Sequence, residues 1–480
     1  MREHRGNALA SDIVSAAAAV LLVVSGAVGA REPAPAPTFV APAAFEGAPA
    51  TDAAGIDGTA FWHGFGDPAL TRLVEQALAA NTDVRVAMAR VDSANALLRG
   101  ASADRWPTLT AEAGAAHQRL AAVEAPGVTR ADRDAGSTSA GARLAWELDV
   151  FGRVRHGVAA RRAEADATAA DLQALRVSIV ADVSRSYFTL RGLQAQRRVA
   201  RENVASQTET LRLVTAGLDA GRGTAFDTSR ARAQLASTRA RVPALDARIA
   251  TMRHHLAVLV GQAPGTPLAG LDDDDAALPS LPPAVDPGTP GDVLTRRPDV
   301  AAAQARLLAA IARIGVAHSE MFPRFSLGGL LGSVAGDGGG LFHRDGERRL
   351  VALGIDWSFL DIGRTRARLA SARADADAEV ARYEQVLLRA LQETEDALVR
   401  LDRARVEGAE LASAADDGVT AARLARIRYE AGAADLFEVL DAERVLLQAQ
   451  EAEMQARTRT LEHAVELYRA LAGGWEPVRG

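Results

Sequence analysis

Two long stretches of the chain place apolar residues at the spacing of an amphipathic helix. The first runs without proline from Gly152 to about Leu218, and Leu172, Leu175 and Ile179 recur on its apolar stripe three or four residues apart. This pattern predicts one helix of about 65 residues, ~100 Å long at the rise of an α-helix. A helix of that length needs support along its side, as in a coiled coil.

The same pattern returns from Gly363 to about Glu430, with Leu387 and Leu398 on the stripe. Each long stretch ends at a turn that contains glycine, and a second, shorter helical stretch follows it. The sequence therefore predicts two long helical hairpins. Their second helices are expected at residues 225–260 and 435–471.

Two regions, 108–150 and 324–360, carry a different pattern. Each contains two segments of ~10 residues with weak polar–apolar alternation, joined by a polar loop rich in glycine, which favours transmembrane β-hairpins. A soluble two-stranded hairpin fits the same pattern. Four strands cannot close a barrel, which needs about eight, so several protomers would have to pool their strands; three would supply about twelve.

The junctions between the β regions and the long helices are written twice. WELDVFGRVR (146–155) and WSFLDIGRTR (357–366) share their tryptophan, glycine and two arginines at one offset, since 357 − 146 = 211. A tandem duplication of roughly 200 residues explains this. We expect each tryptophan to end a strand, each glycine to let the backbone turn into the helix, and each arginine to begin the polar part. The junction residues are Trp146, Gly152 and Arg153, and Trp357, Asp361, Gly363 and Arg364.

Upstream of the junctions the offset changes to 216, as in Asp83 and Asp299, so a loop between the two points differs by five residues (216 − 211). The spacing of Asp149 and Arg153 also differs from that of Asp361 and Arg364, so the two junctions need not bend alike.

Composition narrows the function classes. The chain has 480 residues, a net charge of −6 and no cysteine. Nucleic-acid binding is therefore not favoured, and disulfides, thiol catalysis and cysteine-ligated metals are excluded. No catalytic motif is present, so we expect no enzyme, no cofactor and no metal site. The acidic run at 272–275 is expected to be a solvated loop.

The N-terminus has the features of a targeting segment. An apolar stretch of about 12 residues follows Arg2 and Arg5, too short to span a bilayer of ~30 Å. The predicted segments are a signal peptide at 1–30, an extended leader at 31–60, a first repeat at 61–261, a linker at 262–297, a second repeat at 298–472 and a tail at 473–480.

Several motifs in this order resemble the TolC-like outer-membrane efflux family, in its multidrug-efflux (OprM/NodT-like) branch. The resemblance covers roughly residues 55–472. It is carried by FWHGFGDPALTRLVEQALAANTDVRVAMAR (61–90), WELDVFGRVR (146–155), LTRRPDVAAAQARLLAAIARIGVAHSEMFPRFSL (294–327), DIGRTRA (361–367) and YEAGAADLFEVLDAERVLLQAQ (429–450).

The resemblance implies a mainly α fold with a small β part. A homotrimer would form a twelve-stranded outer-membrane β-barrel that continues into a long periplasmic α-helical barrel, with an equatorial belt built partly from 262–297. Such a channel is an exit duct for drugs or other small toxic compounds. A periplasmic adaptor and an inner-membrane pump, of the proton-driven resistance-nodulation-division type, deliver the substrate. The alternative is a soluble periplasmic coiled-coil scaffold without a channel.

Two departures from the family concern the anchor and the second junction. The branch usually carries a lipid-bearing cysteine where this chain has Ala27, so we expect a protein without a lipid anchor, held in the outer membrane by its barrel. The family often has proline and phenylalanine before the aspartate that matches Asp361. Here Ser358 and Leu360 stand in that stretch, so the bend is expected to differ.

The family's periplasmic gate maps onto the second hairpin. Asp441 matches the inner aspartate of the constriction, Glu438 an outer polar position, Phe437 an apolar plug, and Tyr429 a tyrosine that ties the tip to its neighbour. A latch arginine is replaced by Ala434. Rings of carboxylates favour cations, and rings of apolar side chains close a pore by packing. The alternative is a solvated helix face.

The hairpin tips must turn a helix sharply, which glycine permits. In the family the tips also meet the adaptor. The tip residues are Gly221, Arg222, Gly223 and Thr224, and Gly432, Ala433, Ala434 and Asp435.

Overall fold

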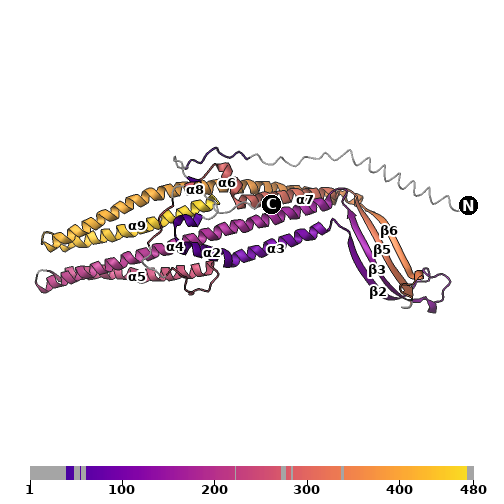
Figure 1. Cartoon of the computed structure of the whole chain (residues 1–480), viewed down its shortest axis with the longest axis horizontal. Coiled ribbons are helices and arrows are strands. Elements are labelled where there is room, and N and C mark those ends of the chain that lie inside the picture. The colour runs from indigo at the N-terminus through magenta and orange to yellow at the C-terminus, as the bar shows by residue number, and fades with distance from the viewer. Residues whose placement is uncertain are drawn as a thin grey trace. The chain divides into compact units, whose positions relative to one another are not determined.

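The structure is a computed structural model, and its elements lie within residues 41–480 (Figure 1). It describes residues 39–47, 54–55, 61–221, 223–271, 277–282, 285–336 and 340–472. The predicted signal peptide and tail, Arg222 and the acidic run 272–275 lie outside the described residues, as does most of the predicted leader.

The chain runs twice through the same order of elements: helix, β-hairpin, long helix and return helix. The first half contains β1 (Ala54–Gly55), η1 (Phe61–Phe65), α2 (Pro68–Ala80), α3 (Thr82–Ala103), β2 (Thr108–Arg119), η2 (Ala131–Arg133), β3 (Asp134–Leu148), α4 (Arg153–Asp219) and α5 (Ala225–Leu259). The second half contains β4 (Val285–Asp286), α6 (Pro290–Arg296), α7 (Pro298–Ser319), β5 (Arg324–Gly336), η3 (Arg344–Gly346), β6 (Glu347–Asp356), η4 (Phe359–Asp361), α8 (Ile362–Glu430) and α9 (Leu436–Ala470).

The two long helices are confirmed. Helix α4 has 67 residues and α8 has 69, so each is about 100 Å long. The predicted stripes are buried at Leu172, Ile179, Leu387 and Leu398. Lateral support comes from the neighbours: α4 packs against α3, α5, α7 and α9, and α8 packs against α7 and α9.

The four strands form one antiparallel sheet in the order β2-β3-β5-β6. The two hairpins therefore join through β3 and β5, which pair from Ser137 with Gly336 to Leu148 with Phe325. Among the described residues β2 and β6 each pair on one side only, so both edges of the sheet are open.

The main core lies where η1 and α2 meet the middle of α4 and the end of α9. Tyr187 and Phe188 of α4 are fully buried there. Phe61 stacks on Tyr468 with ring centroids 4.6 Å apart, and Phe65 lies 4.8 Å from Phe188. Burial of each such side chain stabilises the fold by about 1.5–3 kcal/mol, so this cluster holds η1 and the end of α9 against α4.

The Arg-Arg-Pro-Asp motif has a structural role at the start of α7. The Arg297 side chain is 7% exposed and bonds to Glu393 of α8 at 2.8 Å, to Asp299 at 2.7 Å, and to the Ala470 carbonyl oxygen at 3.0 Å. The buried guanidinium thereby joins α7, α8 and α9. Removing one of its acidic partners would leave buried charge unpaired, which is strongly destabilising.

Helix α7 is the one described helix that is long and apolar enough to cross a membrane by composition. Core helices pass the same test, and α7 packs against α4 and α8 with Ala302 and Leu307 buried. This packing buries part of the apolar surface of α7, whereas Leu308 and Ile311 remain exposed.

Candidate functional site

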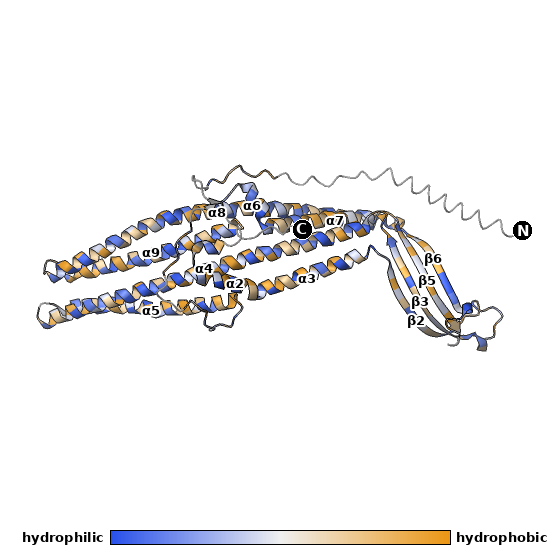
Figure 2. Ribbon diagram, in the orientation of Figure 1, coloured by the Kyte–Doolittle hydropathy of each residue, from blue (hydrophilic) through white to orange (hydrophobic). Residues whose placement is uncertain are grey.

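The register of the sheet sorts its side chains onto two different faces. Cα partners share a face, as do residues two apart on one strand. Leu144 pairs with Leu109 and Gly329, and Gly329 pairs with Val351. Figure 2 shows both polar and apolar residues along all four strands. One face therefore carries the apolar residues Leu109, Leu144, Trp146, Leu148, Phe325, Leu327, Leu331, Val351, Leu353 and Ile355, with the charged Glu347 and Arg349 toward the loop end.

The opposite face is mostly polar or small, although Leu330, Val334 and Leu350 also lie on it. Arg143 forms an ion pair with Glu112 at 2.7 Å across β2 and β3, and Thr110 and Ser326 point to the same side. On the apolar face, Val351 is 83% exposed and Leu353 is 65% exposed. A sheet with an exposed apolar face and a polar face has the side-chain pattern of a transmembrane β-barrel wall.

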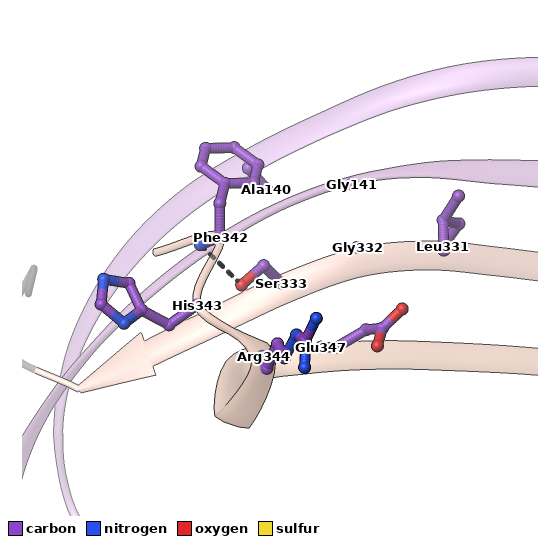
Figure 3. Close-up of a pocket in the computed structure, with 9 residues that line it drawn as sticks. All are labelled: Ala140, Gly141, Leu331, Gly332, Ser333, Phe342, His343, Arg344 and Glu347. Carbon is purple, nitrogen blue, oxygen red and sulfur yellow. Dashed lines mark hydrogen bonds between the residues drawn. The ribbon is translucent and has the colours of Figure 1, made fainter. Parts of the chain in front are cut away.

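The loop between β5 and β6 folds back over a cavity of about 460 Å³ at the end of the sheet away from the helices (Figure 3). The Phe342 amide donates a hydrogen bond to Ser333 Oγ at 3.0 Å, with Phe342 at φ 72°. Gly346 packs so close that a Cβ atom would lie 2.6 Å from the Val334 carbonyl oxygen. These contacts hold the loop on the strand end and do not bring catalytic groups together.

The first junction starts α4 with a left-handed glycine and an aspartate cap. Gly152 has φ 84°, as predicted. The Asp149 carboxylate accepts hydrogen bonds at 2.9 Å from the backbone amides of Val154 and Arg155. Burial opposes ionisation of Asp149, but these bonds and the Arg155 guanidinium outweigh it and lower its pKa. Arg153 holds Glu147 with two bonds of 2.8 and 2.6 Å.

The second junction starts α8 differently. The short helix η4 leads into Asp361, whose side chain does not cap α8. Asp361 instead pairs with Arg364 at 3.2 Å. The prediction for Gly363 was wrong: Gly363 lies inside α8 with an ordinary φ, because the helix already begins at Ile362. No left-handed residue is needed where η4 makes the turn.

Both tryptophans make the same hydrogen bond. Trp146 Nε1 donates to the Arg105 carbonyl oxygen at 3.0 Å, and Trp357 Nε1 donates to the Met321 carbonyl oxygen at 3.2 Å. The acceptors are equivalent by the upstream offset, since 321 − 105 = 216. Each indole therefore fixes the end of its hairpin to the second residue after the incoming helix.

The two tips are helix turns of one design. Gly221 has φ 72° and Gly432 has φ 73°, so both end a long helix in the left-handed conformation. The return helices begin at Thr224, which forms a capping box with Asp227, and at Asp435, which caps the Glu438 amide at 3.0 Å. The remaining described tip residues are Gly223, Ala433 and Ala434.

The four predicted gate residues lie together at the second tip, but each acidic one has a partner. Glu438 pairs with Arg428 at 3.1 Å, and Asp441 pairs with Arg444 at 2.7 Å. Phe437 is 53% exposed, whereas Tyr429 packs against a small buried cluster. That cluster contains Val214, Ala231, Leu436, Val439 and Leu440 from both hairpins.

Sequence reasoning missed the arginines at this site. The Arg230 guanidinium lies 4.9 Å from the centroid of the Phe437 ring, on the other hairpin. Arg230, Asp441 and Arg444 line one cavity of about 310 Å³. The i, i+3 spacing of Asp441 and Arg444 could have revealed their pair.

A buried carboxylate also joins the two hairpins near the tips. Glu443 is 5% exposed and accepts 2.8 Å bonds from Thr210 Oγ1 of α4 and from Arg426 of α8. Its role was not predicted, because the sequence pattern alone does not pair residues 233 positions apart (443 − 210). Among the described residues no group of three His, Asp or Glu is arranged to hold a metal ion.

Comparison with known proteins gives one family. The profile described as "Outer membrane efflux protein" matches residues 73–262 and 289–473. The outer membrane protein OprJ of Pseudomonas aeruginosa is 34% identical over 466 residues, covering 92% of this chain and 93% of OprJ. The toluene efflux pump outer membrane protein TtgI of Pseudomonas putida is 32% identical over 412 residues, covering 86% of each chain.

Solved structures agree. The outer-membrane channel OprN superposes with a TM-score of 0.83 at 39% identity, over 91% of this chain and 100% of OprN. The open state of the Neisseria gonorrhoeae MtrE outer membrane channel gives 0.79 at 26% identity, over 91% of this chain and 98% of MtrE.

These matches confirm the expected fold class, mainly α with a small β part, of the TolC-like trimeric channels with a β-barrel and an α-helical barrel. They also favour a channel over a soluble scaffold. The chain therefore belongs to the outer membrane efflux protein family, and it forms the outer-membrane exit channel of an efflux system.

Proposed function

We propose that three copies of the chain close a twelve-stranded barrel in the outer membrane, with the apolar face of the sheet toward lipid. The two-faced sheet is the observation that carries this proposal. The open edges β2 and β6 support it, because pairing β6 of one copy with β2 of the next satisfies the free backbone groups. Four strands per copy make about twelve in a trimer, which is enough to close a barrel.

The hairpin tips are the proposed docking surface for a periplasmic adaptor, which joins the channel to an inner-membrane pump of the proton-driven resistance-nodulation-division type. Their glycine and alanine residues leave the backbone accessible to another helical tip. The tip residues on this surface are Gly221, Gly223 and Thr224, and Gly432, Ala433, Ala434 and Asp435.

The gate is proposed at Phe437, Glu438 and Asp441, with Tyr429 behind them. Phe437, Glu438 and Asp441 share about one turn of α9, and Tyr429 lies in the last turn of α8. Both are at the end opposite the sheet, because α8 and α4 start at the sheet and end at the tips. In a trimer they would form rings of three. Arginines beside both carboxylates temper their charge, so a weak cation preference is expected.

The proposed cargo is drugs or other small toxic compounds. Relatives are named for toluene efflux, for antibiotic efflux and for pyoverdine export. We further propose that the mature protein has no thioether lipid anchor, because the 480 residues contain no cysteine. Fatty-acid labelling that found lipid on the protein would contradict this.

Conductance of the purified protein in a planar bilayer tests the channel and its gate. We expect a small, cation-preferring conductance that rises when Glu438 and Asp441 are both changed to alanine. No conductance from either protein would overturn the channel. An unchanged conductance in the double variant would overturn only the gate.

Fractionation tests the membrane location separately. The protein should require detergent for extraction from outer membranes. Recovery in osmotic-shock fluid would instead support the soluble scaffold.

A further inference from the structure

We propose that Arg230 of the first hairpin is a positioning residue of the closed gate, holding Phe437 of the second hairpin in place. The proposal rests on the gate assigned above. It adds the first hairpin, which carries none of the predicted gate residues, to the mechanism that keeps the pore closed.

Arg230 lies between two aromatic rings. Its guanidinium carbon is 5.7 Å from the ring centroid of Phe226, one turn earlier on α5, and 4.9 Å from that of Phe437 on α9. Both distances fall within the range of a cation–π interaction. Phe437 is 53% exposed, so the arginine is a main restraint on a ring that packing leaves partly free.

The residues of this contact occupy equivalent positions in the two halves of the chain. Phe226 and Phe437 are equivalent positions, since 437 − 226 = 211, and Arg230 is equivalent to Asp441, since 441 − 230 = 211. The two tips therefore carry the same ring followed one turn later by opposite charges. Arg230 and Asp441 line the same small cavity between α5 and α9. Because these charges are opposite, contact between a first and a second tip is favoured over contact between two first tips or two second tips.

Other contacts explain how the Arg230–Phe437 contact, called the lock below, can act at the tip. Deeper in the hairpins, Glu443 and the small apolar cluster already join α4 to α8 and α9. Arg230 is half-buried and precedes Ala231, a member of that cluster, in the sequence. Movement of the first tip, which begins α5 at Thr224, would then reach Phe437 through Arg230 as well as through this cluster.

The consequence concerns docking. An adaptor that engages the first tip at Gly221, Gly223 and Thr224 would displace Arg230 and release Phe437, although it touches no gate residue. One family gate has a latch arginine at the position of Ala434. In this chain Arg230 of the other hairpin places a cation beside the Phe437 ring.

The test is single-channel conductance of variants in planar bilayers. Arg230→Ala should raise the open probability about 2- to 5-fold per protomer, the size expected from loss of an exposed cation–π contact. Phe437→Ala should raise it at least as much, because it also removes the proposed plug. The double variant should gain no more than the larger single change, because both remove one interaction. Arg230→Lys should retain part of the closure, because an ammonium also binds a ring face.

Arg232→Ala is the matched control. Arg232 lies on the same helix and is exposed, and among the described residues it makes no hydrogen bond, ion pair or ring contact. The Arg232→Ala substitution therefore removes the same charge without removing the contact. Its conductance should equal that of the wild type. Thermal unfolding of each variant checks that the fold is retained.

The outcomes separate the two hypotheses. If Phe437→Ala opens the channel and Arg230→Ala behaves like Arg232→Ala, the lock is wrong and the gate stands. Strictly additive effects in the double variant would also overturn the lock. If Phe437→Ala and the Glu438 and Asp441 changes all leave conductance unaltered, the gate itself is wrong.

Discussion

The two strand-to-helix junctions keep one contact and differ in another. Trp146 and Trp357 both fix the strand end to the preceding helix by an indole hydrogen bond. The helices then start by different means: Gly152 with the Asp149 cap at the first, and η4 with Asp361 at the second. The two junctions thus share the tryptophan anchor and differ in how the helix starts, which is possible because several local structures can begin a helix.

Replacing the junction glycines by alanine should show the largest difference in stability between the two junctions. Gly152→Ala should destabilise the protein by about 1–2 kcal/mol, because a Cβ atom is unfavourable at φ 84°. Gly363→Ala should stabilise it by about 0.5–1 kcal/mol, because Gly363 is helical and a Cβ there meets no atom within 4 Å. Thermal unfolding at one scan rate measures both. Equal shifts would show that the junctions are alike.

Replacing the junction aspartates should also cost more stability at the first junction than at the second. Asp149→Ala removes the cap on two backbone amides and should cost about 1–2 kcal/mol. Asp361→Ala removes one exposed ion pair and should cost about 0–1 kcal/mol. The unfolding midpoints of the two variants, measured side by side, decide this. A larger loss at Asp361 would contradict the assigned caps.

The tryptophans should instead behave alike. Trp146→Phe and Trp357→Phe each remove one indole hydrogen bond and keep an aromatic ring, so each should cost about 0.5–1.5 kcal/mol. A large effect at one site and none at the other would show that the anchor is not shared. The same unfolding assay serves as the measurement.

The smallest effect is a pH dependence confined to the first junction. The pKa of Asp149 is lowered in the folded protein from its ordinary value of 3.8. Its stabilisation is therefore fully present above that value and is lost as the pH falls through the lower, folded pKa. The stability difference between wild type and Asp149→Asn should shrink as the pH falls below about 4. A difference constant with pH would contradict this cause.

Patterns along the chain predicted the parts of the fold that local sequence controls. Apolar periodicity located α4 and α8, and the glycines at 221 and 432 located the tips. The error at Gly363 came from a single-residue rule, since identical residues in two copies need not share a conformation. The departure at Ser358 and Leu360 indicated a different bend at the second junction, but not that the short helix η4 makes it.

Contacts between distant segments could not be predicted in this way. Arg230 meets Phe437 across 207 positions (437 − 230), and Phe61 meets Tyr468 across 407 (468 − 61). Both depend on how hairpins pack, which periodicity does not specify. The alternation of the strands was weak in each segment and became clear only when the register aligned four strands.

The open edges of the sheet set an order of events in the biogenesis of the channel. Each unpaired backbone group of β2 and β6 would cost several kcal/mol in hydrocarbon, so a lone protomer cannot reside in the bilayer with its edges bare. Association in the periplasm must precede or accompany insertion. The rate of maturation should therefore rise steeply with protomer concentration, and a protomer produced in excess should accumulate outside the membrane, where chaperones and proteases can reach it.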